Sequence, residues 1–126
     1  MIPAALALAA VAALFHVYVF YLESLAWTGP RARATFGMNA QAAEATRTLA
    51  FNQGFYNLFL VIEIVAGIIA IAAGATAVGA TLVFVGCGSM VLAGLVLVSS
   101  DRSKARAAAL QGVIPALAIV LLALGL

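Results

Sequence analysis

Ionisable side chains interrupt the first long apolar stretch of this sequence. His16 and Glu23 are seven residues apart, so a helix places them on one face, about 10 Å apart along its axis. Histidine is the side-chain type that most readily exchanges a proton near neutral pH. A carboxyl group on the same face is a potential partner, so the two residues are candidates for proton transfer.

Amide and phenol side chains begin the second apolar stretch and form a polar arc of Asn52, Gln53, Tyr56 and Asn57. Gln111 lies about one turn inside the last stretch. Pro115, four residues later, lacks the N–H that would bond the Gln111 carbonyl, which predicts a kink and leaves one more acceptor nearby. Counting about 1.5 Å per residue from the ends of the stretches places these groups at similar depths.

Equal depth predicts one shared pocket, lined by His16, Glu23, Asn52, Gln53, Tyr56, Asn57 and Gln111. Ionisable groups are costly in hydrocarbon, at about 2.5–3.5 kcal/mol for a central acidic residue, and therefore suggest function. The alternative is structural, because a satisfied His–Glu pair and interhelical amide bonds also hold helices together. Glu63 lies deeper, and its role stays open.

Composition identifies the elements that position these groups. Of the 126 residues, 67% are hydrophobic and 8% charged, and the mean hydropathy is +1.22. Such a chain cannot cover a soluble domain with polar surface. The sequence predicts an all-α integral membrane four-helix bundle, a single transmembrane domain over residues 1–126 with spans at about 2–26, 49–73, 78–99 and 107–126.

Charge placement predicts the orientation. All six Lys and Arg residues fall in the first and third loops, and the second loop has none. Positively charged loops favour the cytoplasmic side, so both termini are expected outside. The first loop also holds Asn39, which is expected to cap a short helix. The net charge of +2 gives no reason to expect nucleic-acid binding.

Other site classes find little support in the sequence. With one histidine and no second ligand at a diagnostic spacing, no metal site is predicted. Cys87 cannot form an internal disulfide and is interpreted as a packed core residue. A stripe of small residues seven apart predicts close helix packing within the bundle, or alternatively a homo-oligomer seam; it consists of Gly79, Gly86, Ala93 and Ser100.

Two runs of the sequence resemble a known family. The run from His16 to Glu23, followed by Trp27, Pro30 and Phe36-Gly37, is similar to domain-of-unknown-function family 1304. The run Asn52-Gln53-Gly54-Phe55-Tyr56-Asn57, with the later Gln111-Gly112 and Pro115, is similar as well. The resemblance covers nearly the whole chain and implies a small bacterial four-helix membrane protein. It implies no activity, and Glu63 lies outside its pattern.

We therefore predict a multi-pass protein of the bacterial cytoplasmic membrane. Its polar pocket faces the cytoplasm and binds or moves a small amphipathic or lipid-like ligand. A membrane enzyme using His16 and Glu23 on a lipophilic substrate is one alternative, and a structural interaction subunit is another. The expected partners are the bilayer and a lipophilic small molecule, with a homo-oligomer left open, and no cofactor is identified.

Overall fold

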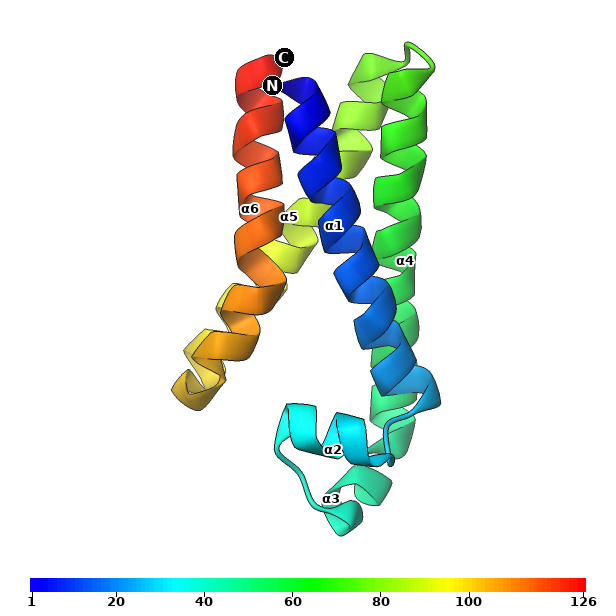
Figure 1. Ribbon diagram of the computed structural model, residues 1–126, viewed down its shortest axis with the longest axis vertical. Coiled ribbons are helices and arrows are strands. Elements are labelled where there is room, and N and C mark those ends of the chain that lie inside the picture. Colours follow the sequence, from blue (N-terminus) through cyan, green and yellow to red (C-terminus); the bar gives the residue numbers. More distant parts are fainter. The chain divides into compact units, whose positions relative to one another are not determined.

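The chain is helical throughout in a computed structural model that describes all 126 residues (Figure 1). The elements in chain order are α1 (Ile2–Phe20), the π-helical turn η1 (Tyr21–Leu25), α2 (Pro30–Phe36), α3 (Ala40–Ala45), α4 (Arg47–Ala72), α5 (Thr76–Ser100), the 3₁₀ turn η2 (Arg102–Lys104) and α6 (Ala105–Gly125).

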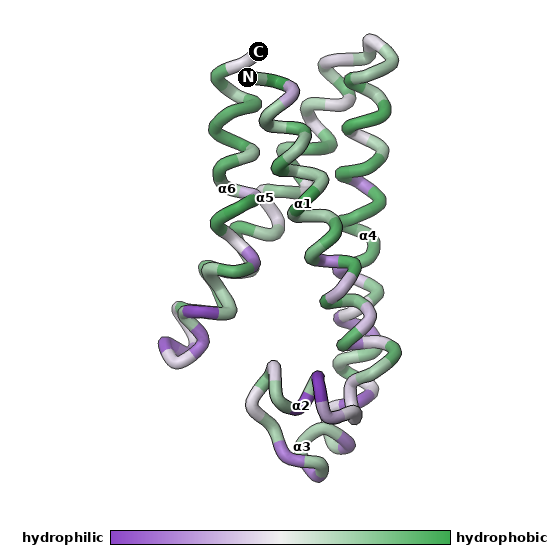
Figure 2. Tube along the Cα trace, in the orientation of Figure 1, coloured by the Kyte–Doolittle hydropathy of each residue, from purple (hydrophilic) through white to green (hydrophobic).

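Four helical segments are long and apolar enough to cross a bilayer: Ile2–Leu25, Arg47–Ala72, Thr76–Ser100 and Arg102–Gly125. Figure 2 shows hydrophobic residues along most of α1, α4, α5 and α6, and hydrophilic residues gathered in α2, α3 and η2. The predicted all-α fold is confirmed, with four helices long and apolar enough to span a membrane. The side of the membrane on which the termini lie stays a prediction.

The chain divides into two compact units. We call residues 16–59 the polar unit, and residues 1–15 together with 60–126 the apolar unit. The divisions fall inside α1 and α4, so each of these helices contributes one segment to each unit. The single transmembrane domain expected from the sequence stays a prediction.

Small residues allow close helix contacts in the apolar unit. A Cβ added to Gly79 of α5 would lie 2.5 Å from the carbonyl oxygen of Gly67 in α4, so the two backbones touch there. A Cβ added to Gly125 would lie 2.9 Å from the Ile2 side chain, which places the two chain ends side by side (Figure 1). Without a hydrophobic driving force between helices in lipid, such close approach supplies the packing energy.

The small-residue stripe on α5 has two different environments. Gly79 and Gly86 are buried, and a Cβ on Gly86 would lie 2.6 Å from the Ile64 side chain. Ala93 and Ser100 are exposed, and Gly94 is buried instead, with a Cβ position 3.0 Å from the Ala108 carbonyl oxygen. A seven-residue spacing drifts by about 20° per repeat on a straight α-helix, so the buried face moves off the stripe.

A capped turn joins α5 to α6. The Asp101 carboxylate accepts hydrogen bonds from the Ser103 backbone N–H at 3.0 Å and from the Ser103 hydroxyl at 2.6 Å. Both bonds stabilise the charged carboxylate, which lowers the pKa of Asp101 below its usual value. This contact begins η2, from which α6 follows directly.

The polar unit contains the connection between the first two spans. Pro30 is the first residue of α2, where its missing N–H is harmless, and Gly37 ends the helix with a φ of 66°. The Asn39 side chain accepts a hydrogen bond from the Ala42 N–H at 2.7 Å, so the predicted cap of the short helix α3 is confirmed. These signals fold the connection into two short helices.

Candidate functional site

A carboxyl–amide pair lies at the centre of the polar unit. The Asn57 side-chain nitrogen donates a hydrogen bond to Glu23 Oε1 at 2.5 Å. Glu23 is 8% exposed, and Asn57 is half-buried on α4. A hydrogen bond to a buried carboxyl group offsets part of the cost of removing it from water. This bond therefore connects the end of the first span with the start of the second.

Glu23 reaches this position from a π-helical turn. The Ala26 N–H donates to the Tyr21 carbonyl oxygen at 3.0 Å, five residues back, so η1 is wound more loosely than α1. A π turn therefore rotates the residues after it relative to a regular helix, and such turns are frequent at functional sites. The expectation that His16 and Glu23 share one helix face assumed 3.6 residues per turn, and this spacing does not hold beyond Phe20.

Ser24 holds η1 tightly against α4. Its hydroxyl donates to the Phe51 carbonyl oxygen at 2.8 Å. A Cβ placed on Gly54 would lie 1.9 Å from Ser24 Oγ, so only glycine leaves room for the hydroxyl group. Phe55 adds ring contacts with Phe20 and Phe51, at centroid distances of 5.2 and 5.0 Å. The glycine and these rings position the segment that carries Glu23.

The remaining predicted site residues have varied surroundings. His16 is buried in the same unit, with 2% of its surface exposed. Asn52, Gln53 and Tyr56 are exposed on α4. Gln111 is half-buried on α6 and belongs to the apolar unit. The structure joins Glu23 and Asn57 directly, and the shared pocket of all seven residues stays a prediction.

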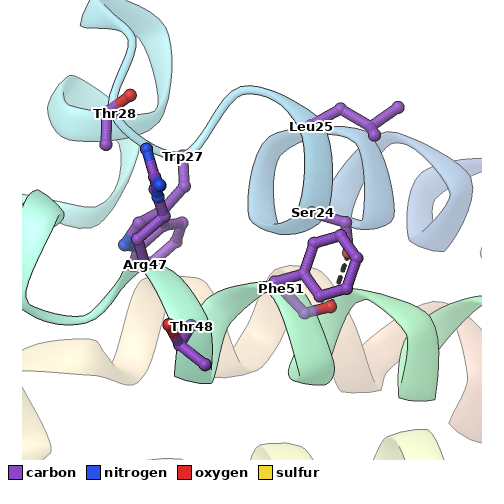
Figure 3. A pocket seen from close by; sticks show the side chains of 7 residues that line it. All are labelled: Ser24, Leu25, Trp27, Thr28, Arg47, Thr48 and Phe51. Atoms are coloured by element: carbon purple, nitrogen blue, oxygen red, sulfur yellow. Dashed lines mark hydrogen bonds between the residues drawn. The ribbon is translucent and has the colours of Figure 1, made fainter.

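The polar unit also has a hollow of about 430 Å³, which we call the interfacial hollow. Its lining residues come from the end of the first span, the following turn and the first turns of α4: Ser24, Leu25, Trp27, Thr28, Arg47, Thr48 and Phe51. Figure 3 shows Trp27 and Arg47 at one end of the hollow, and Ser24, Leu25 and Phe51 at the other. None of the seven predicted pocket residues lines it.

Arg47, the one charged residue that lines the interfacial hollow, forms only a weak ion pair. Arg47 forms an ion pair with Glu44 at 3.7 Å, and both side chains are 65% exposed. The Trp27 indole N–H donates to the Thr46 hydroxyl at 3.0 Å, and its ring contacts Phe36 at a centroid distance of 5.0 Å. Trp27 is thus held in place, while Arg47 keeps most of its hydrogen-bonding capacity for water or a ligand.

Arg31 is another cation of the polar unit, besides Arg47 and Arg33. The hydrogen-bonding influence of the neighbouring Tyr18 side chain raises the pKa of Arg31 above its ordinary value. Arg31 follows Pro30 in α2 and keeps a positive charge near the end of the first span.

The apolar unit contains a second hollow of about 270 Å³, lined by residues of α5 and α6 from Val91 to Ala116. All its lining side chains are apolar, so they offer a ligand neither charges nor hydrogen bonds. No group of three or more His, Cys, Asp or Glu residues in the chain is arranged to hold a metal ion. Cys87 is buried as a free thiol.

Comparison with protein families gives one match. A family model described as a protein of unknown function (DUF1304) matches residues 10–123. The match includes the Glu23–Asn57 pair and every residue of the interfacial hollow. Comparison with curated proteins and with solved structures gives no match.

Proposed function

The chain belongs to the DUF1304 family, whose description assigns no function, and we propose from its own residues that it binds a small amphipathic or lipid-like molecule within the membrane. The supporting observation is the buried Glu23 carboxyl group, joined to Asn57 at 2.5 Å in a multi-pass helical chain. The proposed ligand places its polar group at this pair and its apolar part among lipid-facing side chains.

Exposed amide side chains near the pair support a binding role. Asn52 and Gln53 are exposed on α4 about one turn before Asn57, although helix packing alone would not require exposed amides there. A polar group in hydrocarbon lacks hydrogen-bonding partners, so a ligand bearing hydroxyl or carbonyl groups would satisfy them. Opening of this site towards the cytoplasm follows from the predicted orientation.

Helix pairing is the competing explanation, and one observation favours it. The Glu23–Asn57 bond already links two spans, and such bonds stabilise helix association by about 0.6 kcal/mol on average. The enzyme alternative needs a proton path between His16 and Glu23, which are seven residues apart in the sequence, in addition to a bound substrate. Binding needs no such proton path, so we place it first.

Protection of Glu23 from a hydrophobic carbodiimide tests binding. This reagent modifies carboxyl groups in apolar surroundings, and peptide mapping reads the modification at Glu23 and at Glu63 in the same sample. Glu63 is half-buried in the apolar unit and serves as the internal control. A bound ligand predicts slow modification of Glu23 in native membranes and faster modification after exhaustive detergent exchange, with Glu63 unchanged. Equal rates at Glu23 before and after exchange would favour helix pairing.

A further inference from the structure

The interfacial hollow lies where two spans end. Leu25 is the last residue of the first span, and Arg47 is the first residue of the second. Leu25 and Phe51 therefore border the hydrocarbon, whereas Thr28 and Thr48 sit with Arg47 at the polar boundary. Trp27 lines the same hollow, and tryptophan is the residue type enriched at this depth of a bilayer. The hollow is thus at the height of lipid head groups.

The lining chemistry matches an oxyanion. Arg47 is the one charged residue among the lining side chains, and no carboxylate is among them. Ser24, Thr28 and Thr48 add hydroxyl groups, of which the Ser24 hydroxyl already donates to Phe51. A guanidinium with neighbouring hydroxyl donors suits the several oxygens of a phosphate group. The volume of about 430 Å³ lies within the roughly 300–1,000 Å³ of small-molecule sites.

We propose that the interfacial hollow is a binding site for a phosphate-type anion, with Arg47 as the charged contact and Thr28 and Thr48 as hydroxyl donors. An anionic phospholipid head group and a free phosphate share this chemistry. The site does not depend on the proposed function, because its lining residues exclude both Glu23 and Asn57.

Glu44 competes with the anion for Arg47. The Arg47–Glu44 pair is exposed, with a separation of 3.7 Å, and pairs of this kind contribute little to stability. An incoming phosphate exchanges a weak contact for a charge-assisted one. Removing the Glu44 carboxylate should therefore strengthen anion binding. A gain of affinity is useful as a test because a misfolded variant does not produce it.

Trp27 provides the measurement. It is the single tryptophan of the chain and lines the hollow, so its fluorescence reports occupancy without a label. The full chain is reconstituted in nanodiscs of phosphatidylcholine, and the mole fraction of phosphatidylglycerol is raised in phosphate-free buffer. In a second arm, inorganic phosphate is added to pure phosphatidylcholine nanodiscs. The variants are Arg47→Gln, Glu44→Gln and, as a control with the same loss of charge, Arg106→Gln on α6.

The site predicts a saturable Trp27 emission change in at least one arm. A response to phosphatidylglycerol alone identifies the lipid head group as the ligand, and a response to inorganic phosphate identifies a free anion. Arg47→Gln should weaken the response about tenfold, Glu44→Gln should strengthen it about twofold, and Arg106→Gln should leave it unchanged. No saturable change in either arm would overturn the site. Equal losses in Arg47→Gln and Arg106→Gln, or weaker binding by Glu44→Gln, would also overturn it.

Discussion

The Asn57 amide lies 2.5 Å from the Glu23 carboxyl group and joins α4 to the π-helical turn at the end of the first span. Glu23 is 8% exposed, so its carboxyl group depends on this neighbour for hydrogen bonding in place of water. The pair can hold helices together, receive a ligand, or do both, and the two roles respond differently to substitution.

The structural role of the pair is measured by a double-mutant cycle. Asn57→Leu leaves the Glu23 carboxyl group without its amide donor, and we expect a loss of about 1–3 kcal/mol in the free energy of unfolding. Glu23→Leu combined with Asn57→Leu should cost less than the sum of the single variants, by about 0.5–1.5 kcal/mol. Equilibrium unfolding in mixed micelles gives these values.

Ser89→Ala is the control for this cycle, because the Ser89 hydroxyl bonds only the Val85 carbonyl oxygen of its own helix at 2.7 Å. It should change the free energy of unfolding by less than about 0.5 kcal/mol. Strict additivity of the Glu23 and Asn57 substitutions would mean that their hydrogen bond contributes nothing in the membrane protein.

The Gly54–Ser24 contact predicts a severe effect of a single methyl group. Gly54→Ala places a Cβ 1.9 Å from Ser24 Oγ, so η1 must move away from α4 or the serine must change its rotamer. We expect a destabilisation of about 1–3 kcal/mol, comparable to overpacking a core. Thermal unfolding in detergent compares this variant with Gly88→Ala, where the added Cβ would meet nothing within 4 Å apart from its chain neighbours and its own helix backbone.

Gly88→Ala should be neutral or slightly stabilising, since alanine favours a helix over glycine by about 1 kcal/mol. The second substitution Ser24→Gly should restore part of the stability of Gly54→Ala, because it removes the clashing hydroxymethyl group. The same melting temperature for Gly54→Ala and Gly88→Ala would contradict the close contact.

Packing along α5 distinguishes two members of the small-residue stripe. Gly86→Leu inserts a large side chain where a Cβ alone would lie 2.6 Å from Ile64, so the variant should aggregate or lose its monodisperse elution from a sizing column. Ala93→Leu should behave as the wild type, because Ala93 is exposed. Disruption by Ala93→Leu would indicate that this exposed position is an interface with another chain.

Topology is tested by single cysteines in a Cys87→Ala background, where the buried native thiol no longer contributes. The positive charges of the two basic loops predict that Ser103→Cys is labelled only after the membrane is permeabilised. A cysteine at position 75, in the uncharged link before α5, should react with an impermeant external reagent. The opposite pattern would invert the orientation and place the Glu23 end of the first span outside.

Much of the fold could be predicted because lipid imposes a simple rule. A spanning segment must satisfy its backbone internally, so a long apolar run is a helix whatever its neighbours are. Local signals also sufficed for Asn39, whose side chain caps α3. The π turn at Tyr21–Leu25 has no comparable signature, since its extra residue depends on tertiary contacts such as Ser24 with Phe51.

The candidate site could be predicted only in part. The polar pattern indicated Glu23 and Asn57, which the structure joins. Arg47 and Thr48 escaped notice as site residues because charged and hydroxyl side chains at a span boundary are ordinary there. Gln111 belongs to the apolar unit, and its place in the pocket stays a prediction, because sequence spacing on one helix carries no information about distances to another.

The most direct test of the proposed function is native mass spectrometry of the protein extracted from its own membrane in a mild detergent. A ligand held at the Glu23–Asn57 pair predicts one additional mass on the wild type that is lost from Glu23→Gln and Asn57→Leu. The same mass should persist on Ser89→Ala, whose hydroxyl bonds its own helix. A wild type that carries no such mass, or a mass that persists equally on all three variants, would contradict binding at this pair.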